Sequence, residues 1–259
     1  MTDSRSVEMG ELTWEEFDDH VDGSVVFVPV GSTEQHGPHL PLNVDTVIAT
    51  EFSRRVARRV DGLVAPPLPY GFKSQAGSGG GADFTGTTNL DGETLRRLFG
   101  DVVGDLVADG ATKIVAFNGH FENEYFLREA VDLHLEAGDG EFIIASWWDL
   151  LSPDVRDDLF SEVAGGFPGW ATEHAGVVET ALMQHFRPEL VRDDRIVDDG
   201  PDHSPPYVFK PARDDQIAST GAYYKATYAT PEMGERVVDD VLDTLVEGIA
   251  HEWSDAVPE

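Results

Sequence analysis

Two short clusters of side chains that bind divalent metals stand out in this sequence. Glu34 and His36 come first, Asp45 follows nine residues later, and His120 and Glu122 lie far downstream. Each cluster comes directly after an apolar run typical of a buried strand. Because side chains alternate along a strand, residues two apart point the same way if the backbone stays extended. These five side chains are enough to hold two metal ions, so a hydrolytic enzyme is the leading hypothesis.

The charges of these residues suit a site with two divalent ions. Two such cations lie about 3.5–4 Å apart and repel each other unless anions stand beside and between them. Glu34, Asp45 and Glu122 supply three negative charges and a bridging hydroxide a fourth, while two imidazoles add nitrogen donors suited to zinc or manganese. In one arrangement Asp45 bridges, Glu34 and His120 hold one ion, and His36 and Glu122 hold the other. The sequence leaves this division open.

A purely structural explanation competes with the metal site. Asp45 would then cap the following helix, and the histidines would be ordinary loop residues. A single E-x-H pair would be a weak signal, but two clusters at two strand ends are stronger, because Gly31, Gly37 and Gly119 permit close backbone approach. His39 is the weakest candidate ligand, since it lies out of phase with the first pair.

The apolar pattern elsewhere indicates alternating strands and helices. Short apolar runs typical of buried strands cover residues 25–30, 63–65, 114–117 and 142–145. Helical patterns cover residues 47–56, 95–107, 126–137 and 237–249, the last after an N-cap at Thr230 and a proline at position 231. This order predicts one α/β domain over residues 1–259, with three α/β/α layers and a largely parallel central sheet. The segment 192–225, rich in Asp and Pro, is expected to be a long excursion.

The candidate ligands fall where the expected strands end. Residues 31–36 follow the strand that ends at Val30, and residues 118–120 follow the strand that ends at Phe117. In open α/β sheets, sites form beyond the carboxyl ends of the strands. We therefore expect one edge of the sheet to collect the ligands.

The composition is strongly acidic. The 259 residues carry a formal net charge of −31, and lysine occurs at only four positions, Lys73, Lys113, Lys210 and Lys225. The acid is spread along the whole chain rather than gathered in a tail, which favours adaptation to a salt-rich cytoplasm, where a Debye length of about 3 Å at 1 M salt screens the repulsion. A nucleic-acid partner is not expected with this sign of charge.

The sequence also lacks features of exported or membrane proteins. There is no cysteine, so disulfides and thiolate chemistry are excluded. No apolar segment follows residues 1–5, so we expect no signal peptide. No apolar run approaches the roughly 20 residues that span a bilayer. We expect a soluble, cytoplasmic protein without a membrane partner.

At these residues the sequence resembles the creatininase family. The similarity rests on GSTEQHGPHLPL at residues 31–42 with Asp45, and on Asn-Gly-His at residues 118–120. Further similar stretches are YGFKSQ at 70–75, SGGG at 78–81, NGHFEN at 118–123, and GWATEHAG at 169–176 running into Glu179. Many members carry a second glycine where this chain has Glu122, so Glu122 is the more specific marker. The resemblance spans residues 27–188.

The resemblance implies a cyclic amidohydrolase that interconverts creatinine and creatine, built as a homohexamer around binuclear metal sites. It implies that the five residues above ligate zinc, manganese or both. It places around a small-molecule substrate the side chains of Ser78, Phe121, Trp148, Trp170 and His174. Two departures bear on creatinine recognition: Phe121 stands where a tyrosine is expected, and Ala171 stands where an acidic residue is usual.

The expected mechanism has a metal-bridging hydroxide attack the lactam carbonyl, with the pKa of the bound water lowered toward about 7. His174 is the candidate proton donor to the leaving amine, with Glu122 as a second catalytic group. A core histidine satisfied by a backbone carbonyl is the structural alternative for His174. Glu173 either orients His174 or is a solvated charge. Glu179, among apolar neighbours, is expected to be buried and to orient a ligand histidine.

Two other functions are compatible with the same residues. A formamide-type amidohydrolase acting on a nucleotide-like intermediate would need basic residues for its phosphate, and Lys73 is the only lysine near the motifs. A catalytically silent metal-binding protein is the second alternative, although intact ligands on both sides of the site argue against it. A nucleotide-dependent dehydrogenase is disfavoured, because no G-x-G-x-x-G follows a strand.

Overall fold

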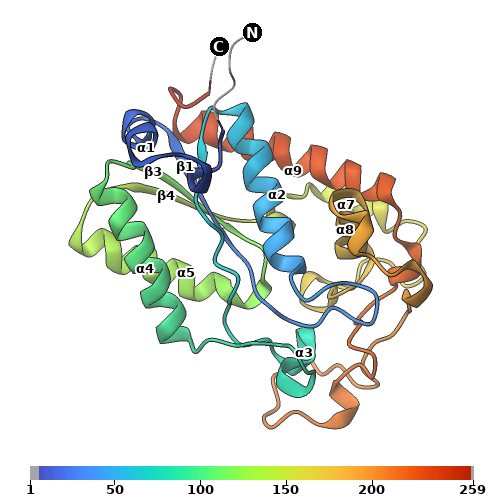
Figure 1. Ribbon diagram of the computed structural model, residues 1–259. Helices are drawn as coiled ribbons and strands as arrows, with labels where there is room; N and C mark the ends of the chain where they lie inside the picture. The colour runs from blue at the N-terminus through green and yellow to red at the C-terminus, as the bar shows by residue number, and fades with distance from the viewer. Residues whose placement is uncertain (1–5, 258–259) are drawn as a thin grey trace.

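The computed structural model describes residues 6–257, which form an α/β fold around a four-stranded sheet (Figure 1). The strands are β1 (Val25–Val30), β2 (Leu63–Val64), β3 (Lys113–Asn118) and β4 (Glu141–Ser146), all parallel, in the order β2-β1-β3-β4. Every residue of β1 and β3 is buried, as continuous apolar runs in a parallel sheet require. The expected largely parallel sheet is confirmed. Met1–Arg5, where no signal peptide is expected, lie outside the described residues.

Helices cover both faces of the sheet. On one face lie α2 (Val44–Arg59), α8 (Val177–Phe186) and α9 (Pro231–Glu252), and on the other lie α1 (Trp14–Val21), α4 (Gly92–Ala108) and α5 (Glu124–Ala137) (Figure 1). Alternate residues of β1 separate the two cores, with Phe27 facing the first set of helices and Val28 facing the second. The three-layer α/β/α architecture is therefore confirmed, and the single domain over residues 1–259 stays a prediction.

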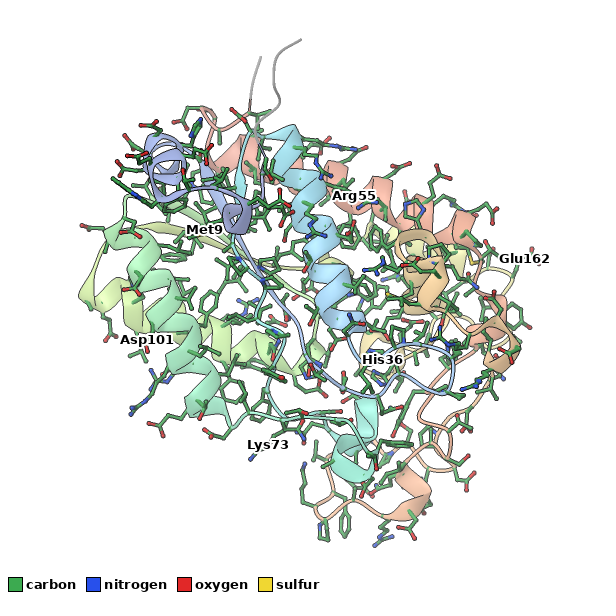
Figure 2. All side chains as sticks on the ribbon, in the orientation of Figure 1. Met9, His36, Arg55, Lys73, Asp101 and Glu162 are labelled. Atoms are coloured by element: carbon green, nitrogen blue, oxygen red, sulfur yellow. The ribbon has the colours of Figure 1, made fainter. Side chains whose placement is uncertain are left out.

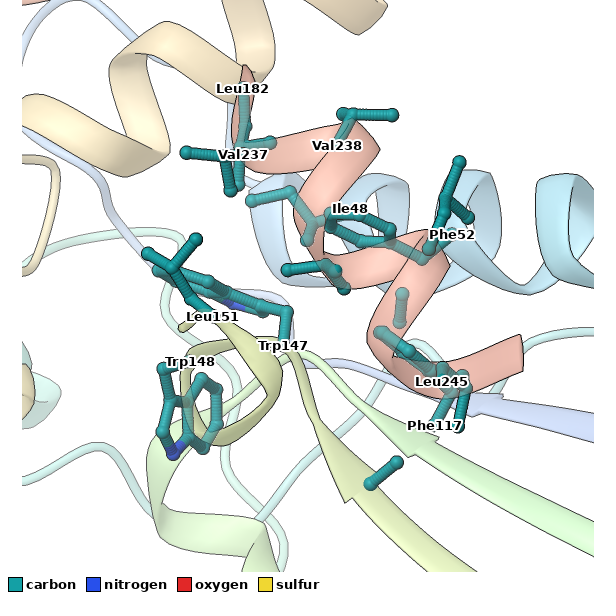
Figure 3. Close-up of a cluster of buried hydrophobic side chains, with 14 of the residues drawn as sticks. Ile48, Phe52, Phe117, Trp147, Trp148, Leu151, Leu182, Val237, Val238 and Leu245 are labelled. Atoms are coloured by element: carbon teal, nitrogen blue, oxygen red, sulfur yellow. The ribbon is translucent and has the colours of Figure 1, made fainter. Parts of the chain in front are cut away.

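The larger core lies between α2 and α9. Figure 3 shows Ile48 and Phe52 of α2 facing Val237 and Leu245 of α9. The Phe52 ring also stacks on Phe117 of β3, with ring centroids 5.4 Å apart. Full burial of one such side chain contributes about 1.5–3 kcal/mol. This contact fixes α2, and with it the candidate ligand in its first turn, against the sheet.

The expected N-cap of the last helix is present. The side chain of Thr230 accepts a hydrogen bond from the Met233 amide, and Pro231 occupies the first helical position, where its missing N–H costs nothing. Within residues 6–257, no helix combines the length and apolar character needed to cross a bilayer.

Short elements and loops gather beyond the carboxyl ends of the strands. They include α3 (Ala76–Gly79), α6 (Trp147–Leu150), α7 (Pro153–Leu159) and single 3-10 turns such as η3 (Phe121–Asn123) and η4 (Trp170–Thr172). The segment 192–225 contains only short 3-10 turns and runs beside α3 (Figure 1), so the expected excursion is confirmed. Its Tyr223 hydroxyl donates to the Ala76 carbonyl at 2.5 Å.

Candidate metal centre and active site

Two glycines let the strand ends press against the first turn of α2. A Cβ on Gly119 would lie 2.2 Å from the backbone oxygen of Asp45, and one on Gly31 would lie 2.5 Å from the Thr46 nitrogen. No other residue fits so close to backbone atoms. As a result, the ends of β1 and β3 both meet α2 at Asp45. Figure 2 shows His36 near this first turn, on the loop that follows β1.

The candidate ligands form three groups: one joins Glu34, His36 and His174, and two share Asp45. In the first of the two that share Asp45, Nδ1 of His120 lies 3.0 Å from Oε1 of Glu34 and 3.1 Å from Oδ2 of Asp45. In the second, Nε2 of His36 lies 3.0 Å from Oδ1 of Asp45 and 3.6 Å from Oε2 of Glu179. In each group one donor atom per residue falls within 4.8 Å of the others, and all the residues are buried. Asp45 does not cap α2, because its carboxylate faces both histidines.

These residues fit a pair of divalent cations. Oε2 of Glu34, Nε2 of His36 and Oδ2 of Asp45 have no hydrogen-bond partner in the described part of the chain, although all three atoms are buried. Buried polar atoms are normally paired, so three unpaired atoms aimed at one space need another kind of partner. Cations between them would satisfy all three. The mixture of imidazole and carboxylate donors suits zinc or manganese.

The electrostatics of the centre favour positive charge. Burial by itself lowers the pKa of His36, but Asp45 and Glu179 raise it by more, so this pKa lies well above its usual range. Burial raises the pKa of Asp45, but His36 and His120 lower it by more, so this pKa lies below its usual range. The buried carboxylates therefore create a strong demand for nearby cations, which divalent metals meet.

His120 and Glu122 do not point toward the same place, as Glu34 and His36 do. The chain enters the turn η3 directly after His120, so the extended backbone assumed from the sequence is absent there. Oε2 of Glu122 consequently lies 3.3 Å from Nε2 of His120, the nitrogen that faces away from Glu34 and Asp45. Glu122 belongs to none of the three ligand groups. Its roles as ligand and catalytic group stay predictions, whereas Glu179 lies directly against His36.

Ser78 and Glu122 are joined. The Ser78 hydroxyl donates a short hydrogen bond to Oε1 of Glu122, which also accepts from the Gln75 amide at 3.3 Å. Ser78 lies on α3, so this bond connects the glycine-rich segment to the end of β3. A hydroxyl and a carboxylate are thus presented together beside the metal centre.

His174 is held by a backbone carbonyl and still faces the site. Its Nε2 lies 2.8 Å from the backbone carbonyl oxygen of Gln35, to which it donates when it carries the proton, and 3.1 Å from the Gln35 side-chain nitrogen, from which it accepts when it does not. Its Nδ1 lies 3.9 Å from Oε1 of Glu34. Gln35 therefore satisfies Nε2 in either tautomer, while Nδ1 faces the ligands.

Gln35 is a residue that sequence reasoning missed. Its amide nitrogen donates to the carbonyls of Gly79 and Gly221, both at 2.9 Å, while its own carbonyl holds His174. Three segments distant in sequence therefore meet at one buried side chain. Its position between Glu34 and His36 is the signal in the sequence that points to it.

Glu173 is buried, which excludes the solvated alternative and leaves a role near His174 as a prediction. Its Oε1 accepts the Val178 amide at 2.8 Å, which satisfies a donor in the first turn of α8. Burial, and then the nearby Glu179, raise the pKa of Glu173 well above its usual range. Glu179 in turn accepts the Ala175 amide at 2.6 Å. Both carboxylates thus fix the backbone that follows His174.

His39 stands apart from the ligands, as expected. Its Nε2 lies 2.9 Å from the Thr180 hydroxyl, and it belongs to none of the ligand groups found among residues 6–257. Burial, helped by His36, lowers its pKa to about 4. His39 is therefore neutral and structural.

The metal centre faces a small cavity of about 30 Å³. All five side chains expected around the substrate line it: Ser78, Phe121, Trp148, Trp170 and His174. Aromatic rings form much of the wall, with Phe121 and Trp148 at 5.6 Å and Trp147 and Trp170 at 5.3 Å between centroids. Such faces attract a planar, partly cationic ring by about 0.5–2 kcal/mol each. Trp147 packs in the core and also reaches the cavity.

The sequence is similar to proteins of known activity along most of its length. A family model for creatininase, described as creatinine amidohydrolase, matches residues 10–249. The creatinine amidohydrolase of Pseudomonas putida is 42% identical, covering 96% of this chain and 98% of that protein. The mycofactocin precursor peptide peptidase of Mycobacterium ulcerans is 35% identical, covering 88% of this chain and 85% of that protein.

The fold is also similar to those of solved structures. A creatininase variant in complex with creatine matches with a TM-score of 0.91 at 40% identity, covering 96% of this chain and 99% of that one. Solved creatininases of the same fold include a Zn–Zn form and a Mn form. The family model, the similar proteins and the geometry of the ligands all indicate the same family. This chain belongs to the creatininase family.

Proposed function

We propose that this protein is a binuclear-metal amidohydrolase that opens the lactam ring of creatinine to give creatine, in a reversible reaction. One observation carries the proposal: two buried groups of ligand atoms share Asp45 at the carboxyl edge of the sheet. Relatives with this fold that are similar along the whole chain are creatinine amidohydrolases. A cyclic amide is therefore the substrate class that the site supports best.

Two groups of residues would hold the ions. Glu34, Asp45 and His120 form one, and His36, Asp45 and Glu179 form the other, with zinc or manganese as the metals. Bound ions of this kind polarise a carbonyl and lower the pKa of water toward about 7. Glu122, through its contact with Nε2 of His120, would orient that ligand if it does not bind metal itself.

The other side chains bind the substrate and move protons. Trp148 and Trp170 provide apolar faces for the planar ring, and Phe121 covers its open side. As water adds to the carbonyl carbon, Nδ1 of His174 takes up a proton, and it returns that proton to the ring nitrogen when the C–N bond breaks. Gln35 contacts Nε2 through its backbone carbonyl and its side-chain nitrogen and so orients the ring. Ser78 and Glu122 complete the polar side of the cavity.

A direct assay tests this function against its alternatives. Purified protein in high salt, loaded with manganese or zinc, is given creatinine in one reaction and N-formyl compounds in another. We expect creatine to appear from creatinine. Formate release without creatinine turnover would favour the formamide-type hydrolase. Two bound metals without turnover of either substrate would favour the non-catalytic metal-binding protein.

We also propose that the protein is a cytoplasmic homohexamer adapted to high salt. The net charge of −31 supports the salt adaptation, and exposed apolar residues such as Leu133 and Leu135 offer surface for subunit contacts. Sedimentation and thermal melting in high and low salt test both points. We expect dilution to loosen the assembly and to lower the melting temperature. A melting temperature independent of salt would contradict the adaptation.

A further inference from the structure

A second and larger cavity opens beside the metal centre. This groove has a volume of about 430 Å³ and lies between the region of α3 and the excursion segment 201–216. Four residues line both the groove and the small cavity, namely Ser78, Phe121, Glu122 and Ala171. The groove is therefore continuous with the site where the proposed reaction takes place.

The small cavity and the groove would bind different parts of a substrate. The cavity of about 30 Å³ at the ligands has room for little more than one or two waters. It leaves little space beyond the reacting part of the substrate. Any substituent on the substrate ring must extend past Phe121 and Ala171 into the groove. Phe121 is 41% exposed and stands at this junction.

The far wall of the groove is apolar and exposed. Tyr207, Val208 and Phe209 are 65%, 82% and 40% exposed, an unusual concentration in a chain with so acidic a surface. The Phe209 ring is held in place by the Arg213 guanidinium, which lies 4.6 Å from its centroid. Lys210 donates a short hydrogen bond to the Gln75 side chain and so ties this wall to the opposite one.

One side of the junction, formed by Phe121 and Ala171, is apolar like the wall, while Ser78 and Glu122, which also line the junction, are hydrogen-bonded to each other. Ala171 offers only a methyl group, and the Phe121 ring carries no hydroxyl that would need a polar partner. Neither side chain places a polar atom where the cavity widens into the groove. An apolar group can therefore pass along Phe121 and Ala171 without desolvating a polar side chain there.

We propose that the groove binds an apolar substituent of the substrate, so that the enzyme opens cyclic amides bearing an aromatic or branched side chain beside the reacting carbonyl, in addition to creatinine. This inference rests on the proposed amidohydrolase function. In the reaction, the oxygen of one water bonds to the carbonyl carbon, the ring C–N bond breaks, and a water proton passes to the nitrogen. The product is a linear carboxylate, and no further reactant is required.

The test compares creatinine with its 5-benzyl derivative on the metal-loaded protein. Burial of the benzyl group predicts about a tenfold higher kcat/KM for the derivative. A second readout needs no turnover: calorimetry is expected to show about tenfold tighter binding of the ring-opened benzyl product than of creatine. Equal or weaker binding of the benzyl product would overturn the inference.

Variants locate the effect in the groove. In the double variant Tyr207→Ala/Phe209→Ala, the preference for the benzyl compound over creatinine should fall about tenfold in both readouts. Both side chains are exposed, so folding should be little affected. Trp14→Ala is the matched control, because it removes an exposed aromatic ring far from the groove and should leave the preference unchanged. A preference that survives the double variant would place the substituent elsewhere and overturn the inference.

The outcomes separate this inference from the function on which it rests. Turnover of creatinine without any benzyl preference would disprove the groove as a substituent site and leave the amidohydrolase intact. A benzyl preference in calorimetry without turnover of either ring would disprove the amidohydrolase and leave the binding groove. A structure of the assembled protein with a neighbouring subunit filling the groove would identify the apolar wall as an interface and overturn the inference.

Discussion

The carboxyl edge of the sheet and the excursion from Arg192 to Lys225 meet at the same site but are built in opposite ways. At the edge, Asp45 and His120 are buried and fixed by strands and by α2. The excursion contains only isolated 3-10 turns, and Tyr207 and Val208 on it are well exposed. The rigid region supplies the ligands, and the irregular one supplies a wall of the groove.

This difference reflects two separate requirements. Metal ligands must hold their positions to within a few tenths of an ångström, so they sit on elements whose cores leave no freedom. A surface that accepts substrates of different size has no such need, and loops tolerate sequence change at little cost to the fold. We therefore expect substitutions at the edge to change chemistry, and substitutions on the excursion to change stability and substrate preference.

The largest effect is expected for His120→Ala at the edge. Loss of this ligand should lower kcat/KM for creatinine by roughly a thousandfold or more, since a metal contributes several kcal/mol and each 1.36 kcal/mol is tenfold. The circular dichroism spectrum should be nearly unchanged. His134→Ala, on the exposed side of α5, is the control and should retain activity. Full activity in His120→Ala would remove this residue from the mechanism.

The next effect concerns the division of ligands. Glu179→Gln should reduce the metal content, measured by elemental analysis, from two ions per subunit to about one, because the group around His36 loses its second carboxylate. The exposed Glu129→Gln on α5 should keep both ions. Two ions retained in Glu179→Gln would show that Glu179 only orients His36.

The same analysis settles the part played by Glu122. We expect Glu122→Gln to lower kcat, because its carboxylate contacts both Ser78 and His120. A parallel loss of one ion would make Glu122 a ligand, as the sequence suggested. Unchanged metal content would place it in proton transfer or ligand orientation.

A smaller effect is expected for Gly221→Ala on the excursion. Its φ is +81°, and a Cβ there would lie 1.9 Å from the side-chain oxygen of Gln35. The strain should cost about 1–3 kcal/mol and lower the melting temperature by several degrees. Gly200→Ala is the control on the same segment, because its Cβ meets nothing closer than 3.5 Å. Equal stability of the two variants would show that the excursion is not anchored at Gln35.

The smallest effect is a pH dependence of the anchor at Tyr223. Burial raises the pKa of Tyr223 from 10 to about 12. Because the folded-state pKa is raised, the stabilisation is complete below pH 10 and is lost as pH rises toward 12. Melting curves of Tyr223→Phe should show about 1 kcal/mol lower stability at neutral pH and a shallower decline between pH 10 and 12. The exposed Tyr125→Phe should behave as the unmodified protein; identical alkaline slopes for Tyr223→Phe and the unmodified protein would contradict the assignment.

Much of the edge was predictable from the sequence. The run of residues 25–30 forms β1 with the predicted bounds, and the N-cap at Thr230 is present, because both depend on local pattern. The close approach at Gly119 was also expected, since a glycine after a buried strand is a specific signal. The convergence of Glu34, His36 and Asp45 followed from these features.

The rest depends on tertiary contacts that leave no local pattern. The turn after His120 redirects Glu122, and nothing in its sequence distinguishes that turn from a continued strand. Gln35 binds partners 44 and 186 residues away, so its role emerges only once the chain is folded. The groove is formed by the weakly patterned excursion, whose position no periodicity reports.

The contacts of Gln35 bear on the fraction of protein molecules that can carry out catalysis at any moment. Gly221 and His174 are held through the same residue, one by its amide nitrogen and the other by its carbonyl. The Tyr223 amide, on the same loop, also donates to the His174 carbonyl at 2.9 Å, so a molecule whose outer loop has detached loses a restraint on His174. Attachment of the loop that contains Gly221 and correct placement of the His174 imidazole for proton transfer are therefore coupled. Heat or denaturant would thus reduce turnover in proportion to the attached fraction, before any ion leaves.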